Sequence, residues 1–354
     1  MTHVKTHTGR RYRFRALALL AVLVGACSAD NLTSSNSPES TDGLASDPVA
    51  ADSLAADSVA PLTAPQILAE IYLYSSRGQA YGPAELWASS TTLKTSLPFT
   101  GSTNFTSPSS IVTQINAARN KRQRLILNMT GGSHSRYKTN GKFDLAKWKA
   151  VQNQFNTSAI KYAVAKGVAD GTVIMNSVMD EPSIKDWGGV MTKPLLDKMA
   201  QYVKNMFPTL PAGVALRHDW RTYEKFRVMD AYITLYRWNK GPILSFRDAV
   251  LYQARSQNMK VMFALNVIDG GQLKTSSWYC PQPLTGGKGS YYPTCRMSAT
   301  NVLNWGKTLG PAGCGLMMWR YDDAFMSKSA NITAFKSLAS FMLYTPGKTC
   351  RRTA

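Results

Sequence analysis

Short runs of apolar residues alternate along most of this chain with longer segments whose apolar residues recur every three or four positions. The short runs are typical of buried strands, and the longer segments are typical of helices that pack on a sheet through one face. The pattern predicts strands at 67–74, 97–99, 125–129, 172–179, 213–216, 231–236, 261–267 and 315–319, the second being the weakest. It predicts helices at 107–122, 143–165, 193–207, 242–256 and 331–343.

Strands that alternate with helices predict an α/β protein with a parallel sheet. Eight such strands within 67–347 suit a single (β/α)8 TIM barrel, which usually takes roughly 250 residues. An open doubly wound sheet is the alternative. No GxGxxG motif follows the first predicted strand, so we predict no dinucleotide or other cofactor. Residues 348–354 remain as a C-terminal tail.

The segment before the predicted barrel lacks this alternation. Residues 1–26 combine an arginine-rich start, a short apolar run and small residues directly before Cys27. The run is too short to cross a bilayer, so it predicts an export signal, and its ending resembles a bacterial lipobox that would make Cys27 the lipidated first residue. An ordinary signal peptide is the alternative. Residues 27–66, rich in Ser, Ala, Asp and Pro, predict a flexible tether. We therefore expect a protein of the bacterial cell envelope, lipid-anchored to a membrane.

The charge of the chain is strongly positive, with 41 Lys and Arg against 21 Asp and Glu, or +20. The leader and the tether contribute charges of opposite sign that nearly cancel, so the excess belongs to the predicted barrel. In an exported protein this favours anionic glycans, cell-wall polymers or lipid headgroups as neighbours over nucleic acid. A generally basic surface without a particular partner is the alternative.

Four further cysteines follow Cys27, and an even number in an exported domain predicts two disulfides. Pairing Cys280 with Cys295 would close one loop, and pairing Cys314 with Cys350 would tie the chain end to the last strand. The other two connectivities remain open.

Polar and aromatic residues gather where the predicted strands end. Active sites of (β/α)8 barrels are built at the carboxyl ends of the strands. Aromatic rings stack on sugar faces while carboxylates and arginines bind hydroxyls, so this composition predicts a carbohydrate site, and its arginines favour an acidic sugar. Ordinary rim residues are the alternative. The expected substrate-binding residues are Tyr74, Arg77, Asn128, Arg217, His218, Asp219, Tyr236, Arg237, Trp238, Asn266, Trp319, Tyr321 and Asp322.

The predicted fourth strand ends in Asp180-Glu181-Pro182. Here the chain resembles the clan of (β/α)8 glycoside hydrolases that place Asn-Glu-Pro at the end of the fourth strand. The resemblance implies hydrolysis of an O-glycosyl bond, with Glu181 as the general acid/base and Asp180 in the place of the sugar-binding Asn. Trp319 resembles the aromatic platform of such barrels. The likeness covers the layout from 67 to 345, and its motif is three residues long.

The clan takes its nucleophile from a Glu at the end of the seventh strand, which this chain lacks. Asp269 is the nearest carboxylate. Retaining enzymes hold the two carboxyl groups about 5–5.5 Å apart and inverting enzymes about 6.5–9.5 Å apart. A third possibility resembles the Asp-Glu pair of the hexosaminidases, in which the substrate's own acetamido group attacks. The alternatives to Asp269 as partner are Asp219, Asp322 and Asp323.

Two structural interpretations compete with catalysis. Asp180 before Pro182 suits a helix N-cap, and Glu181 in a first turn suits the helix dipole. The missing seventh-strand Glu also suits a non-catalytic surface lipoprotein that binds glycans with a degenerate barrel. A metal site is disfavoured, because the predicted barrel has two histidines, His134 and His218, and no HExxH motif.

Overall fold

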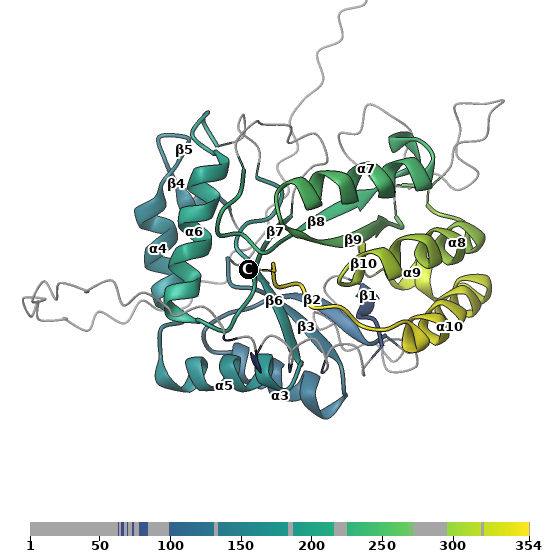
Figure 1. The fold of residues 1–354 in the computed structure, drawn as a ribbon, viewed down its shortest axis with the longest axis horizontal. Coiled ribbons are helices and arrows are strands. Elements are labelled where there is room, and N and C mark those ends of the chain that lie inside the picture. The colour runs from purple at the N-terminus through teal and green to yellow at the C-terminus, as the bar shows by residue number, and fades with distance from the viewer. Residues whose placement is uncertain are drawn as a thin grey trace, which may run out of the picture. The chain divides into compact units, whose positions relative to one another are not determined.

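Within the described part of the chain, eight strands form one sheet in the order β1-β10-β9-β8-β7-β6-β3-β2 (Figure 1). Neighbouring strands in this order run parallel. The α/β class and the parallel sheet are therefore confirmed. The strands are β1 (Tyr81–Pro83), β2 (Gly101–Phe105), β3 (Arg124–Asn128), β6 (Val173–Ser177), β7 (Ala212–Ala215), β8 (Ala231–Tyr236), β9 (Lys260–Asn266) and β10 (Leu316–Trp319), with a separate antiparallel hairpin of β4 (Lys138–Thr139) and β5 (Lys142–Phe143).

The structure is a computed structural model, and all the residues it describes belong to the compact unit Ala55–Ala354. The predicted leader and Cys27 lie outside them. The described residues are 63, 65–66, 69, 73, 78–83, 99–130, 134–182, 187–215, 225–268, 270–271, 296–319 and 322–353.

The two end strands of the sheet, β1 and β2, are also neighbours. Thr100 N–H donates to Tyr81 O at 2.9 Å, and Thr100 Oγ1 accepts a hydrogen bond from Tyr81 N–H at 3.1 Å. A Cβ added at Gly82 would lie 1.7 Å from Gly101 O, so the two backbones approach without a side chain between them. The sheet therefore curls until its ends meet.

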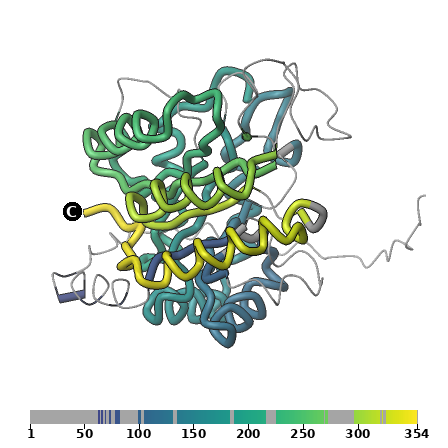
Figure 2. The backbone as a smooth tube through the Cα atoms, turned by 90° about the vertical axis from the view of Figure 1, so that its right-hand side faces the viewer, coloured from purple at the N-terminus to yellow at the C-terminus, as the bar shows by residue number. Residues whose placement is uncertain are grey.

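Helices surround the strands on all sides in Figure 1. α8 and α10 lie side by side (Figure 2), so close that a Cβ at Gly306 would lie 2.4 Å from Leu338. The helices are α3 (Ile111–Asn120), α4 (Leu145–Asn153), α5 (Ser158–Ala169), α6 (Lys193–Met206), α7 (Ile243–Ser256), α8 (Ala299–Leu309), α9 (Asp323–Met326) and α10 (Ser329–Tyr344), with 3₁₀ turns η1 (His134–Tyr137), η2 (Trp238–Lys240) and η3 (Gly310–Ala312).

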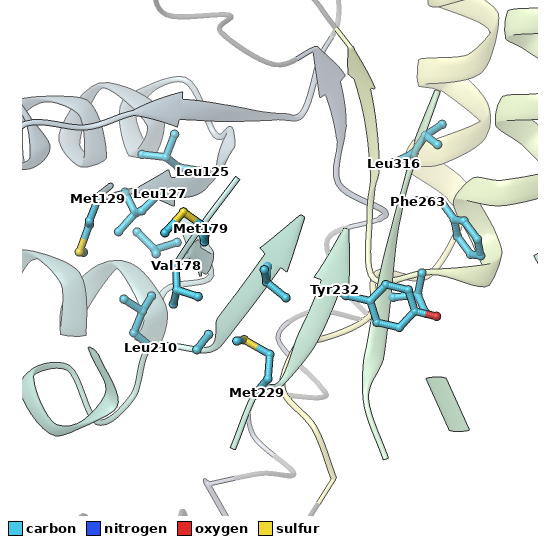
Figure 3. Close-up of a cluster of buried hydrophobic side chains, with 14 of the residues drawn as sticks. Leu125, Leu127, Met129, Val178, Met179, Leu210, Met229, Tyr232, Phe263 and Leu316 are labelled. Atoms are coloured by element: carbon cyan, nitrogen blue, oxygen red, sulfur yellow. The ribbon is translucent and has the colours of Figure 1, made fainter. Parts of the chain in front are cut away.

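The strands bury both of their faces, which explains their continuous apolar sequences. On β9, Met262 and Ala264 belong to a cluster inside the curled sheet, whereas Phe263 and Leu265 belong to the larger cluster under the helices. Side chains alternate because successive residues of a strand point to opposite faces. Figure 3 shows part of the outer cluster, with Leu125, Leu127, Phe263 and Leu316 labelled among others.

The first predicted strand and one predicted helix are wrong, and one helix of the structure was missed. The described residues Ala69 and Leu73, within the predicted first strand, are helical, and β1 lies further along. The apolar residues of 67–74 also recur three and four positions apart, which is the period of the helix that the structure shows. The predicted helix 143–165 is two helices, because Thr157 caps a new start by accepting a hydrogen bond from Ile160 N–H. α8 was not predicted.

The C-terminal strap, residues 345–353, crosses the amino ends of the strands (Figure 1). A disulfide joins Cys350 to Cys314, just before β10, which confirms that predicted pair. Lys348 N–H donates to Gln79 Oε1 at 3.3 Å near β1, and Arg352 N–H donates to Asp230 Oδ1 at 3.2 Å near β8. The strap thus joins opposite sides of the sheet. Cys280 and Cys295 lie outside the described residues.

Candidate active site

The turn after β6 carries the predicted acid pair. β6 is the fourth strand of the large sheet in chain order, as predicted. Ala215 N–H donates to Met179 O at 3.3 Å, so the chain follows β7 up to Met179 before it turns. Asp180 is half-buried and Glu181 is exposed. Both carboxylates therefore stand at the carboxyl edge of the sheet.

The backbone of Glu181 is in the left-handed region, with φ 36°. This conformation costs a side-chain-bearing residue on the order of 1–3 kcal/mol, and it persists only where the surroundings impose it. The buried ring of Pro182 directly follows. Strained residues of this kind cluster at functional sites, so the turn is a candidate for one.

An amide and an indole lie next to each other at the ends of β9 and β10. Asn266 and Trp319 are register partners, and Val267 N–H donates to Trp319 O at 3.0 Å. Ala264 and Met317, two residues earlier on each strand, both face the inner cluster, so Asn266 and Trp319 face the same side. Asn266 is fully buried, whereas Trp319 is partly exposed. Trp319 thus offers part of a flat ring at the inner rim.

The loops after β8 and β9 meet at this edge. Trp238 N–H donates to Gly270 O at 3.0 Å. A Cβ at Gly270 would lie 2.5 Å from Asn266 O, so only glycine lets the loop pass this close to the strand end. Arg237 and Trp238 are both partly exposed here. The structure therefore brings Arg237, Trp238 and Asn266 to one part of the rim.

Asp322, which follows β10 in the chain, contacts two other residues. Its Oδ1 accepts a hydrogen bond from Phe325 N–H at 2.7 Å, which caps the start of α9, and it lies 3.9 Å from an Arg296 guanidinium nitrogen. The side chain of Asp322 remains 28% exposed. Arg296 was not predicted as a site residue, because the stretch around it has no strand or helix signal to place it.

Two of the predicted sugar-binding residues are engaged in contacts within the protein itself. Tyr236 packs against Phe246 and Trp305 on the helix side of the sheet, and its hydroxyl donates to Gly241 O at 2.8 Å. Burial raises the pKa of this hydroxyl. Asn128 is buried, and its Oδ1 accepts a hydrogen bond from Thr130 N–H at 3.2 Å. Tyr236 thus faces away from the rim, and the side-chain amide oxygen of Asn128 stabilises the turn at Thr130.

A cavity of about 280 Å³ opens beside the carboxyl end of β2, between the start of α3 and the end of α4. Arg136 lines it, donates to Thr130 O and lies over the Tyr137 ring, 4.9 Å from its centroid. Burial raises the pKa of Tyr137, although Arg136 beside it acts in the opposite direction. Sequence reasoning missed Arg136, since it falls between the predicted strand and helix.

The remaining predicted site residues cannot be placed, because they lie outside the described residues. Among the described residues, no group of three or more His, Cys, Asp and Glu side chains could hold a metal ion, and no helix is long and apolar enough to span a membrane. The predicted residues outside the described part are Tyr74, Arg77, Arg217, His218, Asp219, Asp269 and Tyr321.

No family model and no curated protein matches this chain. Among solved structures, it is similar to a thermostable mutant of a xylanase from Cellvibrio japonicus, with a TM-score of 0.48, 9% identity, and 76% of this chain and 99% of that chain covered. It is also similar to xylanase 10B from Thermotoga maritima, with a TM-score of 0.45, 11% identity and coverages of 77% and 98%. A GH26-CBM35 β-(1,4)-mannanase from Podospora anserina gives a TM-score of 0.43, 12% identity and coverages of 77% and 63%. The fold assignment rests on the strand order and pairing of this chain.

Proposed function

We propose that this chain is a (β/α)8 barrel that hydrolyses a glycosidic bond in a polysaccharide or oligosaccharide, with Glu181 as the general acid/base. The observation that carries the proposal is the strained, exposed Glu181 at the carboxyl edge of the fourth strand. A general acid must reach the leaving oxygen of a bound substrate, and an exposed carboxyl group at this edge can do so. Asp180 stands beside it as the residue that orients the sugar.

The other described groups of the rim supply binding. Trp319 offers a ring on which a pyranose face can stack, and Arg237 offers donors to hydroxyl or carboxylate oxygens. An acidic sugar is the finer proposal, supported by the net charge of +20. Asp269 is proposed as the second carboxylate. Cys27 is proposed to carry a lipid that anchors the exported protein to the membrane of the cell envelope.

The test measures reducing ends released from xylan, mannan and polyuronate by the wild type and by Glu181→Gln. The variant keeps the size and backbone of the residue but removes the acid, so kcat is expected to fall 10²–10⁴-fold on whichever polymer the wild type cleaves. Asp248→Asn, an exposed carboxylate on α7, is the matched control and should retain full activity. Full activity of Glu181→Gln would refute the assignment.

A second candidate function is glycan binding without hydrolysis. The observation that favours it is Asn266, an amide at the end of β9, the seventh strand in chain order, where the resembled clan has its nucleophile. Calorimetric titration separates the two functions. Binding of an oligosaccharide that the wild type never cleaves, weakened by Trp319→Ala, would establish the binding function instead.

A further inference from the structure

The amino-terminal side of the sheet, opposite the candidate active site, has a cavity of about 730 Å³. It lies between the end of α3, the start of β3 and the last turn of α10. Arg119, Lys121 and Arg122 line it together with the apolar Leu343. Asp170 carries the only carboxylate among the described residues of its wall.

The negative charge of Asp170 is already matched within the wall. Its carboxylate lies 2.5 Å from Arg119 Nε and accepts a hydrogen bond from Thr172 N–H at 3.0 Å. Partial burial raises the pKa of Asp170, but these hydrogen bonds outweigh burial and lower it overall. Asp170 therefore stays ionised and balances Arg119. The side chains of Lys121 and Arg122 are exposed and bring two further cations to the same wall.

Large apolar side chains are exposed at the same place. Leu343, in the cavity wall, is 56% exposed, and the adjacent Tyr344 is 83% exposed. Phe341, one turn earlier in α10, is also exposed, and Lys307 lies over its ring. Contiguous exposed apolar side chains are candidates for an interaction surface, and here Leu343 shares the cavity wall with the cations. We define the cationic patch as Lys121, Arg122, Leu343 and Tyr344.

We infer that the cationic patch docks onto a membrane surface that contains anionic phospholipid. Lysine and arginine are attracted to anionic headgroups, while leucine and tyrosine insert into the interface between headgroups and acyl chains. A soluble anion would use the cations but would leave Leu343 and Tyr344 in water. The inference is independent of the proposed function, because the patch lies at the other side of the sheet.

The path of the chain agrees with this orientation. Gln79 N–H donates to Met342 O at 2.8 Å, so the backbone enters β1 directly beside the last turn of α10. A membrane in contact with the cationic patch would therefore face the end of the sheet at which the chain arrives. The turn with Glu181 would face away from the lipid, toward the surrounding solution.

The test is co-sedimentation of the chain from Ser28 onward with vesicles of phosphatidylcholine alone or mixed with phosphatidylglycerol. This chain retains the whole compact unit Ala55–Ala354 and lacks the basic, apolar leader, which could itself bind lipid. Binding to the mixed vesicles is expected, and it should weaken as salt is added. Lys121→Gln/Arg122→Gln should weaken the binding about 30-fold, since the two cations contribute similar free energies of binding to an anionic surface.

Two matched pairs serve as controls. Lys161→Gln/Lys240→Gln removes the same charge from exposed positions elsewhere and should leave binding within about twofold. Leu343→Ser/Tyr344→Ser should weaken binding, whereas Leu244→Ser/Tyr252→Ser, an equally exposed pair on α7, should not.

Equal binding to both vesicle types, or equal losses in patch and control variants, would overturn the inference. So would displacement of the vesicles by inorganic phosphate or soluble polyuronate at the same ionic strength, because the patch would then be a site for a soluble anion or an acidic glycan.

Discussion

Removing the disulfide between Cys314 and Cys350 should destabilise the protein strongly. The two cysteines are 36 positions apart and buried. In the chain-entropy model, closing a loop of that length lowers the entropy of the unfolded chain enough to stabilise the fold by about 4 kcal/mol at 25 °C. For Cys314→Ala/Cys350→Ala we therefore expect a loss of about 4 kcal/mol in the free energy of unfolding and a fall of roughly 10 °C in Tm.

The assay is urea unfolding followed by tryptophan fluorescence. The variant should also show a larger m value, because an unfolded chain without the cross-link exposes more surface. Hydrogen exchange gives a local readout: Lys348 and Arg352 should lose protection before the central strands do, since the disulfide lies between them. A free energy of unfolding within about 1 kcal/mol of the wild type would refute the entropic argument.

Three further predictions concern the charged and strained residues. Glu181→Gly should be about 1 kcal/mol more stable than Glu181→Ala, because φ 36° favours glycine over alanine; equal stability in urea would remove the argument from strain. Asp230→Ala should lower the free energy of unfolding by about 3 kcal/mol. The buried carboxylate lies 2.7 Å from Lys204 Nζ and accepts hydrogen bonds from Ala212 N–H and Arg352 N–H. Asp248→Ala, at an exposed position, is the control. Asp170→Asn should lower the free energy of unfolding by roughly 1 kcal/mol near neutral pH. Because the folded-state pKa of Asp170 is lowered, its contribution is complete above the unfolded-state pKa of about 3.9 and disappears as the pH falls through the folded-state value; a cost independent of pH would contradict this.

The strands that the sequence predicts well are those with the longest apolar runs. β8 begins and ends where the pattern places it, and β9 is displaced by one residue, because burial on both faces requires nearly every residue to be apolar. β1 has three residues, including Gly82 and Pro83, and such a strand has no periodic signal. It is recognised only through its pairing with β10, which is distant in the sequence.

The candidate site could be predicted in position but not in orientation. The run before Asp180 located the acid pair at the carboxyl edge of the fourth strand, since parallel strands end on one side. The left-handed backbone of Glu181 depends on surroundings that no local pattern encodes. Whether Tyr236 faces the rim depends on the register of β8, and a shift of one residue reverses the answer.

The C-terminal strap also ties completion of the fold to contacts that are very distant in the sequence. The acceptor for Arg352 N–H, Asp230, is 122 positions earlier, and the acceptor for Lys348 N–H, Gln79, is 269 positions earlier. Until residues 345–353 have been synthesised, neither hydrogen bond can form, and Cys314 has no thiol from Cys350 with which to pair. The amino-terminal side of the sheet is therefore completed by parts of the chain that are far apart in the sequence.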